Sequence, residues 1–171
     1  MFRSTVYSCT ATLGKPCDYE TMVKLYRSAD LDEEKDRLMR AGMASFENKD
    51  VLLQALRFAI SDDVRAQDSV FLIGGVARNR LGRDISWEFF KENFAFLKAR
   101  YQSGFLLSNL VKSVSEKFLT EEKAQMVEKF FAENPLPGSE RCVAQSVETI
   151  RLNASWLERD GAAIKSFLAS V

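Results

Sequence analysis

The chain has 171 residues, enough for one domain that buries well over half of the surface its unfolded chain exposes. Hydrophobic residues make up 46% and charged residues 28%, and no apolar run approaches the roughly 18 residues that a membrane span needs, so we expect a soluble globular protein. Lys plus Arg and Asp plus Glu both total 24, so there is no net charge to attract nucleic acid or an anionic membrane.

Hydrophobic periodicity predicts helices along nearly the whole chain. Asp, Asn, Ser or Thr residues, which cap free backbone N–H groups, precede most of the apolar stripes. The predicted helices are 19–29 after Asp18, 33–44 after Asp30 or Asp32, 49–60 after Asn48, 69–79 after Asp68, 87–102 from Asp84 or Ser86, 105–119, 121–134 after Thr120, 139–160 and 161–170. Two of the three prolines lie in residues 134–138, which we interpret as a break between helices. No alternating strand-like segment competes, so an all-α fold is predicted.

The spacing of the helix starts indicates a repeat architecture. Capped starts near residues 18, 48, 83 and 120 mark helix pairs at intervals close to those of two-helix repeat arrays. Residues 52–68 run an apolar helix into an Asp-rich turn and resemble a HEAT-type repeat turn. In that turn the second helix would be capped by Asp62, Asp63 and Asp68. Val64 would make an apolar contact with the first turns of the helix (a hydrophobic staple), and Arg65 would pair with an acidic residue. We therefore predict one domain over residues 1–171, a right-handed α-α superhelix of HEAT/armadillo-like helix pairs.

Residues 70–83, "VFLIGGVARNRLGR", place two glycines and three arginines behind an apolar run. They match neither the G-x-x-x-x-G-K-[ST] phosphate loop nor the G-x-G-x-x-G dinucleotide motif. Gly74 and Gly75 would let a neighbouring helix approach closely, and residues 79–82 would supply left-handed conformations at a helix end. The three arginines, Arg78, Arg80 and Arg83, either lie on a solvated turn or bind an anionic group such as a peptide carboxylate.

Several residue types that catalysis requires are absent or unsuitably placed. Histidine does not occur, which excludes Ser-His-Asp and Cys-His sites and the H-E-x-x-H zinc helix. The pairs Glu33/Glu34 and Glu121/Glu122 lie just inside predicted helix starts. We interpret them as residues that interact favourably with the positive end of the helix dipole rather than as general acids or bases. The three cysteines form no C-x-x-C pair, and we expect reduced structural thiols. Residues 1–14 lack the apolar core of a secretory signal, so a cytoplasmic location is expected.

Several motifs occur in order along most of the chain and together carry a resemblance to a known family. They are V-R-x-Q-D at Val64 to Asp68, "GGVA" at Gly74 to Ala77, W-x-F-x-K-x-N at Trp87 to Asn93, "RYQ" at Arg100 to Gln102 and "LNASWL" at Leu152 to Leu157. With these features the chain resembles the C-terminal helical domain of the puromycin-sensitive aminopeptidase branch of zinc aminopeptidases. The resemblance covers nearly all of this chain but only the last part of that enzyme.

The resemblance implies that this chain does not perform catalysis by itself. In that family a separate domain removes the N-terminal residue from peptides, with an H-E-x-x-H-x(18)-E zinc site and a G-A-M-E-N loop that binds the free amine. Neither motif occurs here. No cofactor is therefore expected in this chain, and zinc is implied only for the catalytic domain of the parent enzyme.

The family's C-terminal domain is a superhelical array that arches over the catalytic domain and encloses the peptide chamber. The resemblance thus implies a non-catalytic domain that governs substrate access, with the catalytic domain and peptides as its partners. It makes five residues candidates to line the chamber and to meet the distal part of a peptide, each with a structural role as the alternative: Arg78, Arg80, Arg83, Arg100 and Tyr101.

Two other interpretations stay open on the sequence alone. One is a stand-alone α-solenoid adaptor that binds a partner protein without an aminopeptidase role, and the other is an autonomous enzyme. The chain also begins inside the family's helical domain, and an array cut between repeats exposes an apolar face. We therefore expect self-association, or docking to an aminopeptidase, through residues at the N-terminal end: Val6, Tyr7, Leu13, Met22, Leu25 and Tyr26.

Overall fold

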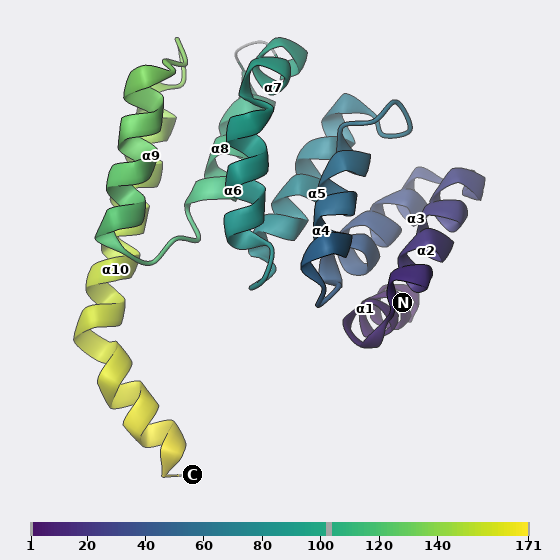
Figure 1. Ribbon diagram of the computed structural model, residues 1–171, viewed down its shortest axis with the longest axis horizontal. Coiled ribbons are helices and arrows are strands. Elements are labelled where there is room, and N and C mark those ends of the chain that lie inside the picture. Colours follow the sequence, from purple (N-terminus) through teal and green to yellow (C-terminus); the bar gives the residue numbers. More distant parts are fainter. Residues whose placement is uncertain (1, 102–103, 171) are drawn as a thin grey trace. The chain divides into compact units, whose positions relative to one another are not determined.

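The computed structural model describes residues 2–101 and 104–170, and over these residues the fold is all-α with no strand. The helices, in chain order, are α1 (Arg3–Leu13), α2 (Pro16–Ser28), α3 (Asp32–Arg37), the π-helical turn η1 (Leu38–Gly42), the 3₁₀ turn η2 (Met43–Ser45), α4 (Lys49–Ala59), α5 (Ala66–Arg78), α6 (Arg83–Glu92), α7 (Phe94–Tyr101), α8 (Phe105–Ser115), α9 (Glu121–Glu133) and α10 (Glu140–Ala169) (Figure 1). The predicted all-α fold is confirmed, and it is consistent with an α-superhelical domain.

The chain divides into two compact units, Met1–Gln102 and Ser103–Val171. In the first unit α4 packs against α5 and α6, α5 packs against α6, and α1 and α3 contact η1 (Figure 1). The buried face of α4 has helical spacing and consists of Val51, Leu52, Ala55, Leu56 and Ala59. Because each fully buried Val or Leu contributes about 1.5–3 kcal/mol, this stripe anchors α4 in the core of the unit.

A close approach between α5 and η2 depends on one of the two adjacent glycines in α5. A Cβ atom on Gly75 would lie 2.7 Å from the Cβ of Ala44, too close for two carbon atoms. Glycine therefore allows α5 to pack directly on η2. This confirms the predicted close-packing role for Gly75.

In the second unit α8 and α9 both pack against the N-terminal half of α10 (Figure 1). Polar side chains join α10 to the end of α8, where Ser146 Oγ donates to the Glu116 carboxylate at 3.1 Å and Asn153 Nδ2 donates to the Glu116 carbonyl at 3.0 Å. Beyond Asn153, α10 exposes large apolar side chains. These are Trp156, Leu157, Ile164, Phe167 and Leu168.

The predicted helix starts are right where the cap lies directly before the helix. Asn48 accepts hydrogen bonds from the backbone N–H groups of Asp50 and Val51, and Thr120 accepts one from Lys123. Asp18, in contrast, lies in the first turn of α2, where it accepts a hydrogen bond from the Lys15 N–H at 2.7 Å. The helix begins earlier than predicted because Pro16, whose backbone torsion suits a first helical position, starts it.

The turn between α4 and α5 also differs from the predicted capping pattern. Asp68 lies in the first turn of α5, and its carboxylate pairs with Arg65 at 2.6 Å, so the predicted ion pair of Arg65 is confirmed. Asp63 does not cap α5 but binds Arg27 of α2 at 2.8 Å. The predicted caps Asp62, Asp63 and Asp68 are therefore wrong, because no side chain caps the start of α5, and Asp63 and Asp68 pair with arginines instead.

Several helix boundaries differ from the predicted ones. The predicted helix 87–102 is two helices, α6 and α7, separated at Asn93, whose side chain donates to the Phe89 carbonyl at 2.8 Å; Gln102 lies outside the described residues. The predicted helices 139–160 and 161–170 are one helix, because a single glycine costs only about 1 kcal/mol in a helix interior. Helix α1 was not predicted, since it buries only Ala11 fully and shows no apolar stripe.

The expected exposed N-terminal patch is only partly present. Met22 and Tyr26 are buried, so they are not available to a partner. Val6, Leu13 and Leu25 are exposed, and self-association through them remains a prediction. Among the described residues, no helix is long and apolar enough to cross a membrane.

Candidate functional site

The candidate site is a polar surface hollow of about 370 Å³ in the first unit. Three arginines and one carboxylate line it: Arg40 from η1, Arg78 at the end of α5, Arg80 in the turn that follows α5, and Glu47. Hydroxyl groups of Ser8 and Thr12 on α1 and of Ser45 on η2 complete the polar wall. With three cations and one anion, the wall favours a negatively charged group.

Asn79 lies between Arg78 and Arg80, and its side chain fixes the backbone of the turn after α5. The Asn79 amide donates to the carbonyls of Ala44 and Phe46, both at 3.0 Å, and its oxygen accepts from the Leu81 N–H. The side chain thus ties the turn after α5 to the η2 segment. Asn79 and Gly82 have negative φ, so the predicted left-handed conformation at this helix end is wrong. The amide bridge fixes the turn instead.

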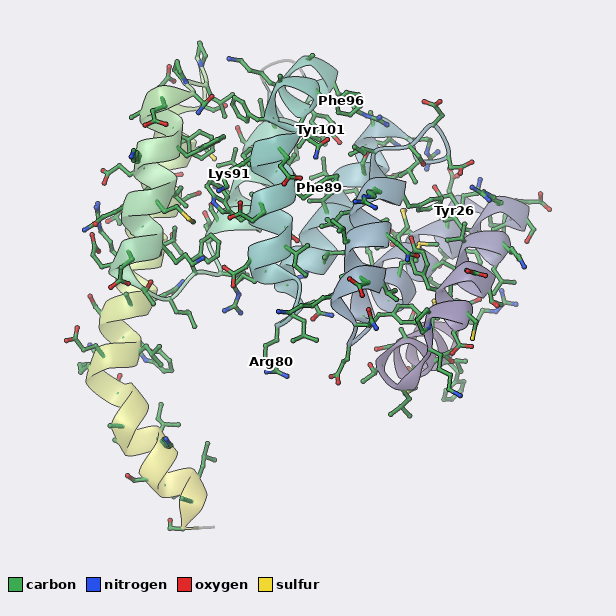
Figure 2. All side chains as sticks on the ribbon, in the orientation of Figure 1. Tyr26, Arg80, Phe89, Lys91, Phe96 and Tyr101 are labelled. Atoms are coloured by element: carbon green, nitrogen blue, oxygen red, sulfur yellow. The ribbon has the colours of Figure 1, made fainter. Side chains whose placement is uncertain are left out.

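Arg78 and Arg80 are exposed, and no carboxylate in the described part of the chain pairs with either of them. Figure 2 shows Arg80 extending away from the helices. Arg40 differs, because its guanidinium stacks on the Phe71 ring at 3.8 Å and bonds to Asp36 at 2.5 Å. The hollow therefore combines two available guanidinium groups with one that is held rigid by its neighbours.

The other predicted site residues lie outside this hollow. Arg100 on α7 donates from Nη1 to the Ile60 carbonyl at 3.2 Å and from Nη2 to the Val64 carbonyl at 2.8 Å, so its guanidinium holds the turn between α4 and α5. Tyr101 is buried, and burial raises the pKa of its phenol. Arg83 begins α6 and is partly buried.

Arg40 was missed by the sequence analysis. It lies in a segment predicted as an ordinary helix, and nothing local connects it with the arginines after α5. The π-helical turn at Leu38–Gly42 and the packing of α5 on η2 bring the two segments together. Only a prediction of that tertiary contact could have found Arg40.

A guanidinium presents five N–H donors in a planar fork that matches a carboxylate or a phosphate. Two available guanidiniums beside the hydroxyl groups of Ser8 and Ser45 can therefore bind such a group with several hydrogen bonds, whereas the Thr12 hydroxyl already donates to the Ser8 carbonyl. The described residues contain no group of His, Cys, Asp and Glu that could hold a metal ion. The residues present thus fit anion binding and do not fit a zinc centre.

Comparison with known proteins gives the class to which this all-helical chain belongs. Residues 1–152 match the family described as the ERAP1-like C-terminal domain. The match spans most of the chain, and the chain belongs to this family. The family assignment agrees with the resemblance drawn from the sequence.

The chain is similar to several aminopeptidases. It is 37% identical over 149 residues to aminopeptidase M1-B of Oryza sativa subsp. japonica, an alignment that covers 87% of this chain and 17% of the relative. Aminopeptidase M1 of Arabidopsis thaliana is 34% identical over 140 residues, covering 82% and 16%. Aminopeptidase N of Oryctolagus cuniculus is 28% identical over 173 residues, covering 98% and 18%. The chain thus spans less than a fifth of the length of these relatives.

Proposed function

We propose that this chain is the non-catalytic C-terminal part of a puromycin-sensitive-type aminopeptidase, where it encloses the peptide chamber and governs substrate access. Its family membership and its similarity to aminopeptidases support the assignment. The observation that carries the substrate role is the hollow of Arg40, Arg78 and Arg80, in which Arg78 and Arg80 have no carboxylate partner among the described residues.

In this proposal the hollow binds the distal carboxylate of a peptide. A peptide backbone is neutral, and its free C-terminus is the one anion that every unmodified peptide carries. Arg78 and Arg80 donate hydrogen bonds to that carboxylate, and the hydroxyls of Ser8 and Ser45 supply further donors. The contact positions the peptide and takes no part in bond cleavage. Zinc and the reacting groups belong to the catalytic domain, the main partner of this chain.

The packed helices act on access by moving together rather than by changing their internal packing. Packed helix pairs rotate together more readily than they deform, so a rotation opens the chamber for peptide entry and closes it around the substrate. The effect on the rate is then indirect and depends on peptide length. A cytoplasmic location remains a prediction from the sequence.

The test uses the full enzyme that contains this chain, with the double variant Arg78→Ala/Arg80→Ala. Its control is Arg141→Ala, an exposed arginine of α10 outside the hollow. Two peptides of equal sequence, one with a free C-terminus and one amidated, are compared with a single-residue chromogenic substrate. If each exposed charge-assisted contact contributes about 1 kcal/mol, the loss of both arginines corresponds to a KM raised about 30-fold.

We expect that rise for the free-carboxylate peptide alone. Hydrolysis of the chromogenic substrate should be unchanged, because it does not reach the hollow. An equal loss on all three substrates would contradict a role in peptide positioning. Binding of the free-carboxylate peptide to the isolated chain, measured by fluorescence anisotropy, separates this role from effects on the catalytic domain. Capture of proteins other than an aminopeptidase by the chain would favour the adaptor function.

A further inference from the structure

The second unit contains an apolar groove of about 460 Å³ between α9 and the N-terminal half of α10. Its floor is formed by side chains that are largely buried, Phe131, Leu136 and Val147, and by the small side chains of Ala132 and Ala144. Because the alanine side chains are small, they leave the groove open to solvent. Nothing in the proposed function uses this groove.

The rim of the groove is acidic. Glu128, Glu140 and Glu148 line it together with a single cation, Arg151. That cation is shared, because it binds Glu128 at 2.9 Å and also Glu121 at 3.1 Å. Glu148 is exposed and stands without an ion pair in the part of the chain that the structure describes. The rim therefore carries an excess of negative charge around an apolar floor.

The length of the groove fits a short helix. Its walls run along α9 and α10, which lie side by side in Figure 1, from the turn before Glu140 to the ion pair of Glu128 with Arg151. The α10 residues from Glu140 to Arg151 span three turns, or about 17 Å at 1.5 Å per residue. A helix laid in a groove between two helices places apolar side chains from positions i, i+3, i+4 and i+7 on the floor.

We propose that this groove binds an amphipathic helix of about three turns from a partner protein, with an apolar stripe on the floor and Lys or Arg residues against the glutamates. The negative charge of the rim favours a basic helix as the occupant of the groove. An acidic helix would meet like charges, and a neutral helix would leave the glutamates without partners.

A second copy of this chain fits the rim less well. Most of its exposed large apolar side chains beyond Asn153 lie on the C-terminal half of α10, where the charged residues are Glu158, Arg159, Asp160 and Lys165. The two cations equal the two acids in number, and Arg159 is already bound to Asp160 at 2.7 Å. That segment offers no excess positive charge to the groove.

The experiment measures binding of a fluorescein-labelled model helix to the full chain by fluorescence anisotropy. The probe carries Leu at positions i, i+3, i+4 and i+7 and Lys on the flanking positions. Two control peptides are used, one with Glu in place of every Lys and one with the same composition in a non-amphipathic order. We expect binding of the first peptide only, weakened by added salt because the rim charges are exposed.

The first variant is Ala144→Arg, which places a bulky cation on the floor, and its matched control is Ala162→Arg on the exposed part of the same helix. Ala144 is exposed, so the fold tolerates the change, which circular dichroism checks. We expect at least a 10-fold weaker affinity for Ala144→Arg and less than a 2-fold change for Ala162→Arg. Equal effects of the two variants would overturn the proposal.

The second variant tests the rim charge. Glu148→Lys should weaken the Lys peptide several-fold and strengthen the Glu peptide, whereas Glu158→Lys, outside the groove, should do neither. Equal binding of the Lys and Glu peptides to the unaltered chain would overturn the proposal. So would a dimer in sedimentation that Ala144→Arg dissociates, because a second copy would then be the occupant. This test is independent of peptide hydrolysis, so its failure leaves the proposed function untouched.

Discussion

The contacts of Arg100 indicate a structural role, which a measurement of the free energy of unfolding can test. Its guanidinium donates to the carbonyls of Ile60 and Val64 at 3.2 and 2.8 Å, and it therefore closes the turn between α4 and α5. Hydrogen bonds from a charged donor contribute about 1.5–3 kcal/mol each, and water replaces part of that loss at a half-buried site. Arg100→Met should then lower the free energy of unfolding by about 2–4 kcal/mol.

Urea denaturation followed by circular dichroism measures this change. Arg100→Lys, which can reach one carbonyl but not both, should lose about half as much stability. Arg80→Met is the matched control, and it should stay within about 0.5 kcal/mol of the unaltered chain because Arg80 is exposed and bonds to no backbone group among the described residues. If Arg100→Met also stays within that margin, water satisfies both carbonyls and the reasoning fails.

Two further predictions concern packing and pH. Gly75→Ala should destabilise the chain by about 1–2 kcal/mol because its Cβ meets Ala44, and adding Ala44→Gly should restore most of the loss. Gly161→Ala in α10 should instead stabilise by up to about 1 kcal/mol, because the Leu157 side chain, 3.1 Å from the new Cβ, is exposed and can shift; thermal denaturation measures all three variants. The hydrogen bond from the Tyr7 hydroxyl lowers the pKa of Glu34 from its ordinary value of 4.5. Because the folded-state pKa is lowered, the stability from ionised Glu34 is complete above the ordinary pKa and is lost as pH falls through the folded one. The stability difference between the unaltered chain and Glu34→Gln should therefore shrink as urea denaturation is repeated from about pH 6 to about pH 3, and a constant difference would refute it.

The fold class could be predicted because its signals are local. Helical spacing of apolar residues and caps such as Asn48 and Thr120 act within a few residues of each other, and the structure confirms them. Asp18 and Asp68 were misplaced because an acid favours both the cap and the first turn of a helix, so composition alone does not fix the start.

The candidate site could be predicted only in part. The run of arginines after α5 is visible in the sequence, and it indicated an anion site or a solvated turn. The sequence did not show that Arg100 donates to two carbonyls, or that Arg78 and Arg80 have no carboxylate partner in the part of the chain that the structure describes. Those differences depend on which segments pack nearby. The role of Asn79 as a bridge to η2 was missed for the same reason.

The sequence by itself determined that this protein is helical, that it contains no histidine for a catalytic or zinc site, and which enzyme family it resembles. These properties follow from residue identity, periodicity and ordered motifs, which need no knowledge of distant contacts. Only the tertiary structure decided that Arg40 joins Arg78 and Arg80, and that α9 and α10 enclose an acidic-rimmed groove. Packing brings residues far apart in the sequence into one surface, and no local pattern records which of them will meet.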